Sequence, residues 1–159
     1  MLNKIQHGGV DAIKALKLLR DEGKISKDLV LMADEMYLQK RAEYSGGEYI
    51  GADEDENLYK GVVAFMVVGM KETTPYVIKA SPEVTIKGKW VSEQIDGCIS
   101  LLAENGFTVR SVVTDNHSTN VNAFSYLRKK YKSSSECFFN HPANHGKKTY
   151  LFFDNVYIC

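Results

Sequence analysis

The sequence lacks an excess of charge of either sign. It contains 20 lysines and arginines against 20 aspartates and glutamates, so its formal net charge is zero. A freestanding nucleic-acid-binding domain is usually basic, because it has to neutralise phosphates. We therefore expect no tight DNA binding from this chain acting alone.

Long apolar segments and paired cysteines are scarce as well. The longest apolar run, residues 61–70, is shorter than the roughly 20 residues that cross a bilayer, and no secretion signal opens the chain. The three cysteines, Cys98, Cys137 and Cys159, are an odd number without disulfide-like spacing. These features predict reduced thiols in the cytosol or nucleus and no membrane partner.

What the sequence does contain is a succession of apolar segments separated by turn residues, in a chain about one domain long. The apolar spacing predicts three helices, at about 8–21, 90–104 and 119–131. Shorter apolar runs predict five strands, at 29–38, 61–70, 76–80, 109–114 and 149–153. The run at 61–70 is nearly continuous, which is typical of a strand buried on both faces.

This order of elements favours one fold class. Consecutive strands with short connections favour an antiparallel meander, whereas strands joined through helices favour parallel neighbours with right-handed crossovers. The prediction is a ribonuclease H-like α/β domain with a mixed five-stranded sheet, made of a three-strand antiparallel meander plus two parallel strands, with flanking helices. The first strand is expected at the centre, beside the fourth.

The closing residues, KKTYLFFDNVYIC, read as a strand without the polar, frayed end that most domains have. We therefore expect residues 1–159 to be one partial domain, with residues 1 to about 25 as a helical lead-in. On this interpretation the domain is truncated before its last helix.

Two aspartates lie in or at the end of apolar strands: Asp34 in LVLMADEMYL and Asp115 in RSVVTDNHSTN. A carboxylate on a buried strand is costly unless a positive charge compensates it, and two on neighbouring strands repel each other. The arrangement therefore predicts a site for Mg²⁺ or Mn²⁺, which prefer oxygen ligands. Two such ions about 3.5–4 Å apart can hold the attacking and leaving oxygens of a phosphoryl transfer, which normally requires a third carboxylate.

Other interpretations of the same residues stay open. Asp115 could form an Asx-type turn, with Ser118 or Thr119 capping the next helix. Asp34 could be an edge-of-strand residue that pairs with a lysine. Glu35 should point to the opposite face of its strand from Asp34 and be solvated.

A second group of chemically active side chains is Cys137, His141 and His145. A cysteine and two histidines are suitable zinc ligands, but a fourth ligand is missing and Pro142 interrupts the stretch. Zinc is the less favoured interpretation. The sequence has no P-loop, no glycine-rich dinucleotide fingerprint and no recognisable nucleophile motif.

Four segments of the chain, taken in order, resemble the ribonuclease H-like catalytic domain of P-element-type transposases. This family includes transposases with an N-terminal THAP zinc finger. The resemblance runs from about residue 15 onward, and its short elements DEM, VVTDNHSTN and FFD are specific through their order and spacing. The segments are LVLMADEMYLQKRAEYSGGEYIG, YKGVVAFMVVGMKETTPYVIKASP, LLAENGFTVRSVVTDNHSTNVNAF and YLFFDNVYIC.

The resemblance implies roles for individual residues. Asp34 and Asp115 match the first and second catalytic, metal-binding aspartates of the family. The third acidic residue of the family is a glutamate beyond a large inserted domain, and neither is found in this sequence. Asp154 falls where the family has an acidic residue before that insertion, and it is not favoured as a substitute third ligand.

The resemblance also implies a function. The full-length family carries out cut-and-paste DNA transposition by metal-dependent strand cleavage and transfer, with Mg²⁺ or Mn²⁺ as cofactor, transposon-end DNA as partner and the nucleus as location. This chain is expected to be an inactive fragment of that catalytic domain, without a GTP site. The alternative is a domesticated, non-catalytic module whose uncovered apolar sheet face binds a protein partner or a second copy of itself.

Overall fold

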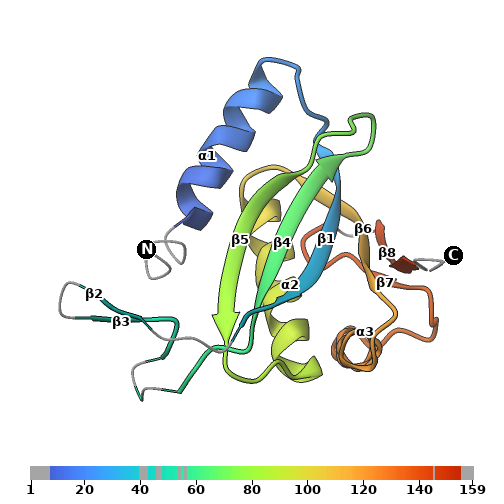
Figure 1. Cartoon of the computed structure of the whole chain (residues 1–159). Coiled ribbons are helices and arrows are strands. Elements are labelled where there is room, and N and C mark those ends of the chain that lie inside the picture. The colour runs from blue at the N-terminus through green and yellow to red at the C-terminus, as the bar shows by residue number, and fades with distance from the viewer. Residues whose placement is uncertain are drawn as a thin grey trace, which may run out of the picture.

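A computed structural model of the chain describes residues 8–39, 43–45, 48–53, 55, 57–144 and 146–154. Three helices and eight strands follow one another along these residues (Figure 1). The helices are α1 (Gly8–Asp21), α2 (Gly88–Glu104) and α3 (Ser118–Lys130). The strands are β1 (Asp28–Tyr37), β2 (Glu43–Ser45), β3 (Glu48–Ile50), β4 (Gly61–Gly69), β5 (Tyr76–Glu83), β6 (Thr108–Asp115), β7 (Phe138–Asn140) and β8 (Lys148–Asp154).

Six of the strands form one mixed sheet in the order β5-β4-β1-β6-β8-β7. β5, β4 and β1 make an antiparallel meander, and β1, β6 and β8 run parallel to one another. The predicted ribonuclease H-like arrangement is confirmed, including β1 at the centre with β6 beside it. β2 and β3 pair only with each other, as a separate two-stranded sheet.

The sixth strand, β7, was not predicted. It is three residues long and pairs antiparallel with the start of β8, so it is too short to show a period in the sequence. The serines before it form local hydrogen bonds. The Ser133 hydroxyl donates to the carbonyl of Phe138 at 2.6 Å, and Ser135 Oγ accepts from the Cys137 amide at 3.1 Å.

The core lies on one face of the sheet. Buried side chains alternate along the strands, as in Leu29, Leu31 and Ala33 of β1, and face the buried stripes of α2 and α3. In Figure 1, α2 lies behind the sheet and the front of β5, β4 and β1 carries no helix. α1 contacts the edge strand β5.

The expectation that the strand at 61–70 is buried on both faces holds only in part, because no residue of β4 is exposed but one face is less completely buried. Along β4, Val63, Phe65 and Val67 are buried, whereas Ala64, Met66 and Val68 are only half-buried. The half-buried set belongs to the face that no described helix covers. Apolar residues on that side of the strand made the run look continuous. Among the described helices, none is long and apolar enough to cross a membrane.

The packing of β7 generates a stability prediction. Phe139 is fully buried and its ring stacks on Tyr131 with centroids 4.8 Å apart. Phe139→Ala should therefore lower the free energy of unfolding by about 3–5 kcal/mol in urea titrations. The matched control is Phe152→Ala on β8, which is 53% exposed and should change it by about 0.5 kcal/mol or less. Equal losses of unfolding free energy in both variants would contradict the assignment of β7 as the sixth strand of the sheet.

Candidate active site

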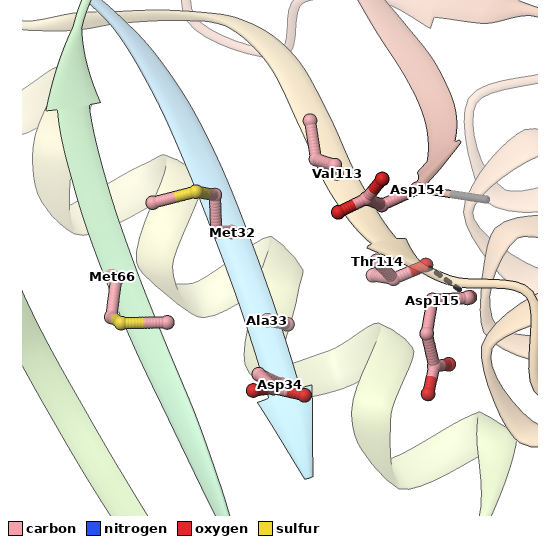
Figure 2. Close-up of a pocket in the computed structure, with 8 residues that line it drawn as sticks. All are labelled: Met32, Ala33, Asp34, Met66, Val113, Thr114, Asp115 and Asp154. Atoms are coloured by element: carbon pink, nitrogen blue, oxygen red, sulfur yellow. Dashed lines mark hydrogen bonds between the residues drawn. The ribbon is translucent and has the colours of Figure 1, made fainter. Parts of the chain in front are cut away.

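Three aspartates come together on three neighbouring strands. Ala33 of β1 pairs with Thr114 of β6, so the next residues, Asp34 and Asp115, lie side by side. Asp115 in turn pairs with Asp154 of β8. Figure 2 shows the three aspartates among the residues that line one pocket. The pocket has a volume of about 220 Å³, and all three aspartates are exposed.

A β-bulge sets this register. Leu29 pairs with Val109, but Val30 pairs with Ser111, so Arg110 is an extra residue in β6. Counted forward without the bulge, Asp34 would lie beside Thr114 rather than beside Asp115. The single inserted residue therefore brings the two carboxylates to the same level of the sheet.

Asp115 is held in place by the start of α3. Its Oδ1 accepts from the backbone amide of His117 at 3.0 Å and from the side-chain amide of Asn120 at 2.7 Å. Asn120 is buried, and the positive end of the α3 dipole adds a favourable field at this carboxylate. Asn120 was missed in the sequence, although an amide in the first helical turn after a strand-end aspartate is the signal for it.

The Asx-type turn at Asp115 is confirmed by the bond from the His117 amide. The predicted cap is wrong. His117, rather than Ser118 or Thr119, is the N-cap of α3, and its Nδ1 accepts from the Thr119 amide at 3.4 Å. The two hydroxyls stand one and two residues too late, because the turn at Asp115 places His117 at the extended position before the helix.

Asp34 has no compensating cation among the described residues. It lies within β1 rather than at the end of the strand, and no described lysine forms an ion pair with it, so the alternative of an edge-of-strand aspartate paired with a lysine gains no support. No described residue donates a hydrogen bond to the Asp34 or Asp154 carboxylate. The Asp34 and Asp154 carboxylates therefore line the pocket without a described hydrogen-bond donor, although the three aspartates do not form a group of three described side chains that could hold a metal ion.

Glu35 is half-buried rather than solvated, in contrast to the prediction. It alternates with Asp34 and so points to the other face of β1, as expected. Burial raises the pKa of Glu35, the nearby His117 opposes this, and the negative charges of Asp115 and Asp34 add to it. The carboxylates at this end of the sheet therefore influence one another electrostatically.

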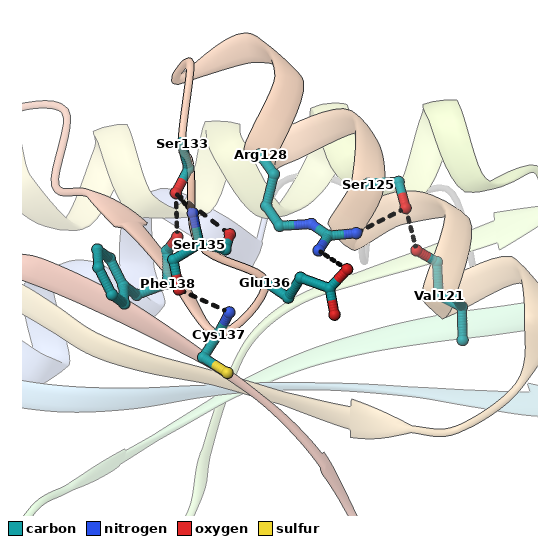
Figure 3. A network of polar contacts seen from close by, with 8 residues as sticks. All are labelled: Val121, Ser125, Arg128, Ser133, Ser135, Glu136, Cys137 and Phe138. Carbon is teal, nitrogen blue, oxygen red and sulfur yellow. Dashed lines mark hydrogen bonds and ion pairs between the residues drawn. The ribbon is translucent and has the colours of Figure 1, made fainter.

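The less favoured zinc site gains no support. Among the described residues, no group of three or more histidine, cysteine or acidic side chains could hold a metal ion. Cys137 is exposed and belongs to the network between α3 and β7 (Figure 3). His141 is buried, with Nδ1 already accepting from the Ala143 amide, and His145 lies outside the described residues.

A family model and a solved structure each match most of this chain. A family model described as "TNP-like, RNase H N-terminal domain" matches residues 9–128. The chain is also similar to a solved structure, the Drosophila P element transposase strand transfer complex, with a TM-score of 0.61 and 22% identity. That match covers 80% of this chain but 26% of the other, so this chain spans about a quarter of its length. No curated protein matches the sequence.

The raised pKa of Glu35 generates a prediction about pH. Between the ordinary value of 4.5 and the raised pKa, the native protein binds more protons at Glu35 than the unfolded chain does. The unfolding free energy therefore falls as pH rises through this window. Glu35→Gln should remove that fall, so the stability of the variant relative to wild type should increase with pH. Urea midpoints across the window measure this, and parallel profiles would count against it.

Proposed function

The chain belongs to the family of TNP-like RNase H N-terminal domains, and from this premise we propose that it is the front part of a DNA transposase catalytic domain. The observation that carries the proposal is the register of β1 and β6, which sets Asp34 beside Asp115 in one pocket. The similarity in fold to a P element transposase supports it. In the full-length protein the partner would be transposon-end DNA, and the place of action the nucleus.

Asp34 and Asp115 are the residues that would hold a divalent cation, Mg²⁺ or Mn²⁺. The donor set fits such an ion, because hard cations take carboxylate oxygens and Asp34 has no other partner among the described residues. When bound, the ion would polarise a phosphodiester and lower the pKa of a bound water. Asn120 is a positioning residue, since its bond to Oδ1 fixes how Asp115 meets the pocket.

Two carboxylates in this chain do not make a complete pair of metal sites. We assign the third ligand to a glutamate beyond these residues, as the resemblance to P-element-type transposases implies. Asp154 lies beside Asp115 in register, yet we give it no catalytic role. This chain acting alone is therefore proposed to bind the cation weakly and to leave DNA uncut.

A second candidate function, a non-catalytic protein-binding module, has one observation in its favour. The sheet face opposite the helices exposes apolar side chains, with Met36 55% and Phe152 53% exposed. Surfaces of this kind are often contacts for another protein. Sedimentation of wild type against Phe152→Ser distinguishes the two proposals, because a module that uses this face would self-associate less after the substitution and would ignore the aspartates.

The metal proposal is tested by calorimetry with Mn²⁺. Asp34→Asn and Asp115→Asn should each abolish measurable binding, because each removes a ligand. Asn120→Ala should weaken binding roughly 10- to 100-fold, since it loosens Asp115 without removing it.

The matched control is Asp55→Asn, an exposed aspartate in the loop before β4, which should leave Mn²⁺ affinity unchanged. Urea unfolding confirms that each variant is folded. Unchanged Mn²⁺ affinity in both Asp34→Asn and Asp115→Asn would contradict the proposed metal site.

A further inference from the structure

A second pocket lies at the opposite end of β6 from the carboxylates. It has a volume of about 140 Å³ and lies between the α2–β6 turn and the β7–β8 loop. Its lining residues are Ala103, Gly106, Phe107, Thr108, His141, Ala143 and Asn144. Thr108 and Asp115 are the two ends of β6, which separates the two pockets by roughly 20 Å at the usual rise per residue of a strand.

His141 is the unusual side chain of this pocket. It is 2% exposed, and its Nε2 is buried without a hydrogen-bond partner among the described residues. Nδ1 accepts from the Ala143 amide at 3.2 Å. In the neutral ring, Nε2 therefore carries the hydrogen and is a donor. A buried donor without an acceptor costs free energy, so an acceptor at this position would be favourable.

The charged neighbours of His141 are cations. Burial lowers its pKa most, and the positive charges of Lys147 and Arg110 lower it further, so the ring is neutral near pH 7. Asp28 offsets part of the Lys147 charge, with its Oδ1 3.9 Å from Lys147 Nζ. Arg110, the bulge residue of β6, has no ion pair among the described residues. Asp28 also pairs with Thr108 of this pocket, so the unpaired charge near the ring is that of Arg110.

A second donor lines the same pocket. Thr108 is buried, and its Oγ1 accepts from the side-chain amide of Asn144 at 3.2 Å. The hydroxyl hydrogen of Thr108 has no acceptor among the described residues. Two donors near the unpaired charge of Arg110 call for a ligand with several acceptor oxygens and a negative charge.

We propose that this pocket binds a phosphate group, with His141 Nε2 and the Thr108 hydroxyl as donors and Arg110 and Lys147 as the compensating charges. The size fits one such group, because the pocket is smaller than the roughly 300–1,000 Å³ of sites for whole small ligands. Water alone fits less well, since it has to donate as well as accept. A metal ion fits poorly, because Nε2 carries a hydrogen.

The experiment uses the whole chain and follows the imidazole nitrogens by NMR. One arm titrates inorganic phosphate, the second titrates a single-stranded oligonucleotide, and sodium chloride at matched ionic strength is the reference. The His141 Nε2 signal should shift in a saturable way in at least one phosphate arm. The exposed His117 is the internal control in the inorganic phosphate arm only, because its amide contacts Asp115 of the site proposed to act on DNA.

A saturable shift in both arms identifies a phosphodiester as the source, whereas a shift with inorganic phosphate alone identifies a free phosphate. Thr108→Val and Lys147→Gln should each weaken the apparent affinity about tenfold, as expected for one charge-assisted contact. Lys129→Gln, on the exposed side of α3, should not. No shift in either arm, or an equal shift with chloride, would overturn the proposal.

Discussion

The parallel pairing of β1 with β6 is the constraint on which the candidate active site depends. Asp34 and Asp115 are distant in sequence, and only this register places them on one face at one level. The bulge at Arg110 is part of the constraint, because without it Asp34 would lie beside Thr114. The alternation of buried and less buried side chains along β1 holds the register. A one-residue slip would turn Leu29 and its buried neighbours toward the uncovered face.

The two ends of β6 differ in chemistry although the chain has no net charge. Carboxylates gather where β6 ends, and the positive charges of Arg110 and Lys147 act on the pocket where it begins. Because positive and negative charges cancel in the total, the net charge of the chain reveals neither region. The zero net charge therefore argues against tight nucleic-acid binding by the chain as a whole. Local contacts with phosphate depend instead on where the charges lie.

Much of the fold could be predicted because periodic apolar spacing directly records which face of an element is buried. The helices, the meander and the parallel pair follow from that spacing and from connection rules, which place Asp34 and Asp115 on neighbouring strands. Their common level depends on the bulge at Arg110, which the spacing does not contain. The three-residue β7 could not, because it is too short to show a period. The surroundings of Glu35 depend on how the start of α3 meets β1 and β6, which no local pattern contains.

The most direct measurement of the central claim is paramagnetic broadening of backbone amide NMR signals by Mn²⁺. The account predicts that amides at Asp34 and Asp115 broaden first, while those at Thr108, at the other end of β6, stay sharp. Broadening that begins instead at the acidic loop around Asp55, with Asp34 and Asp115 unaffected, would contradict the claim that the β1–β6 register builds a cation site.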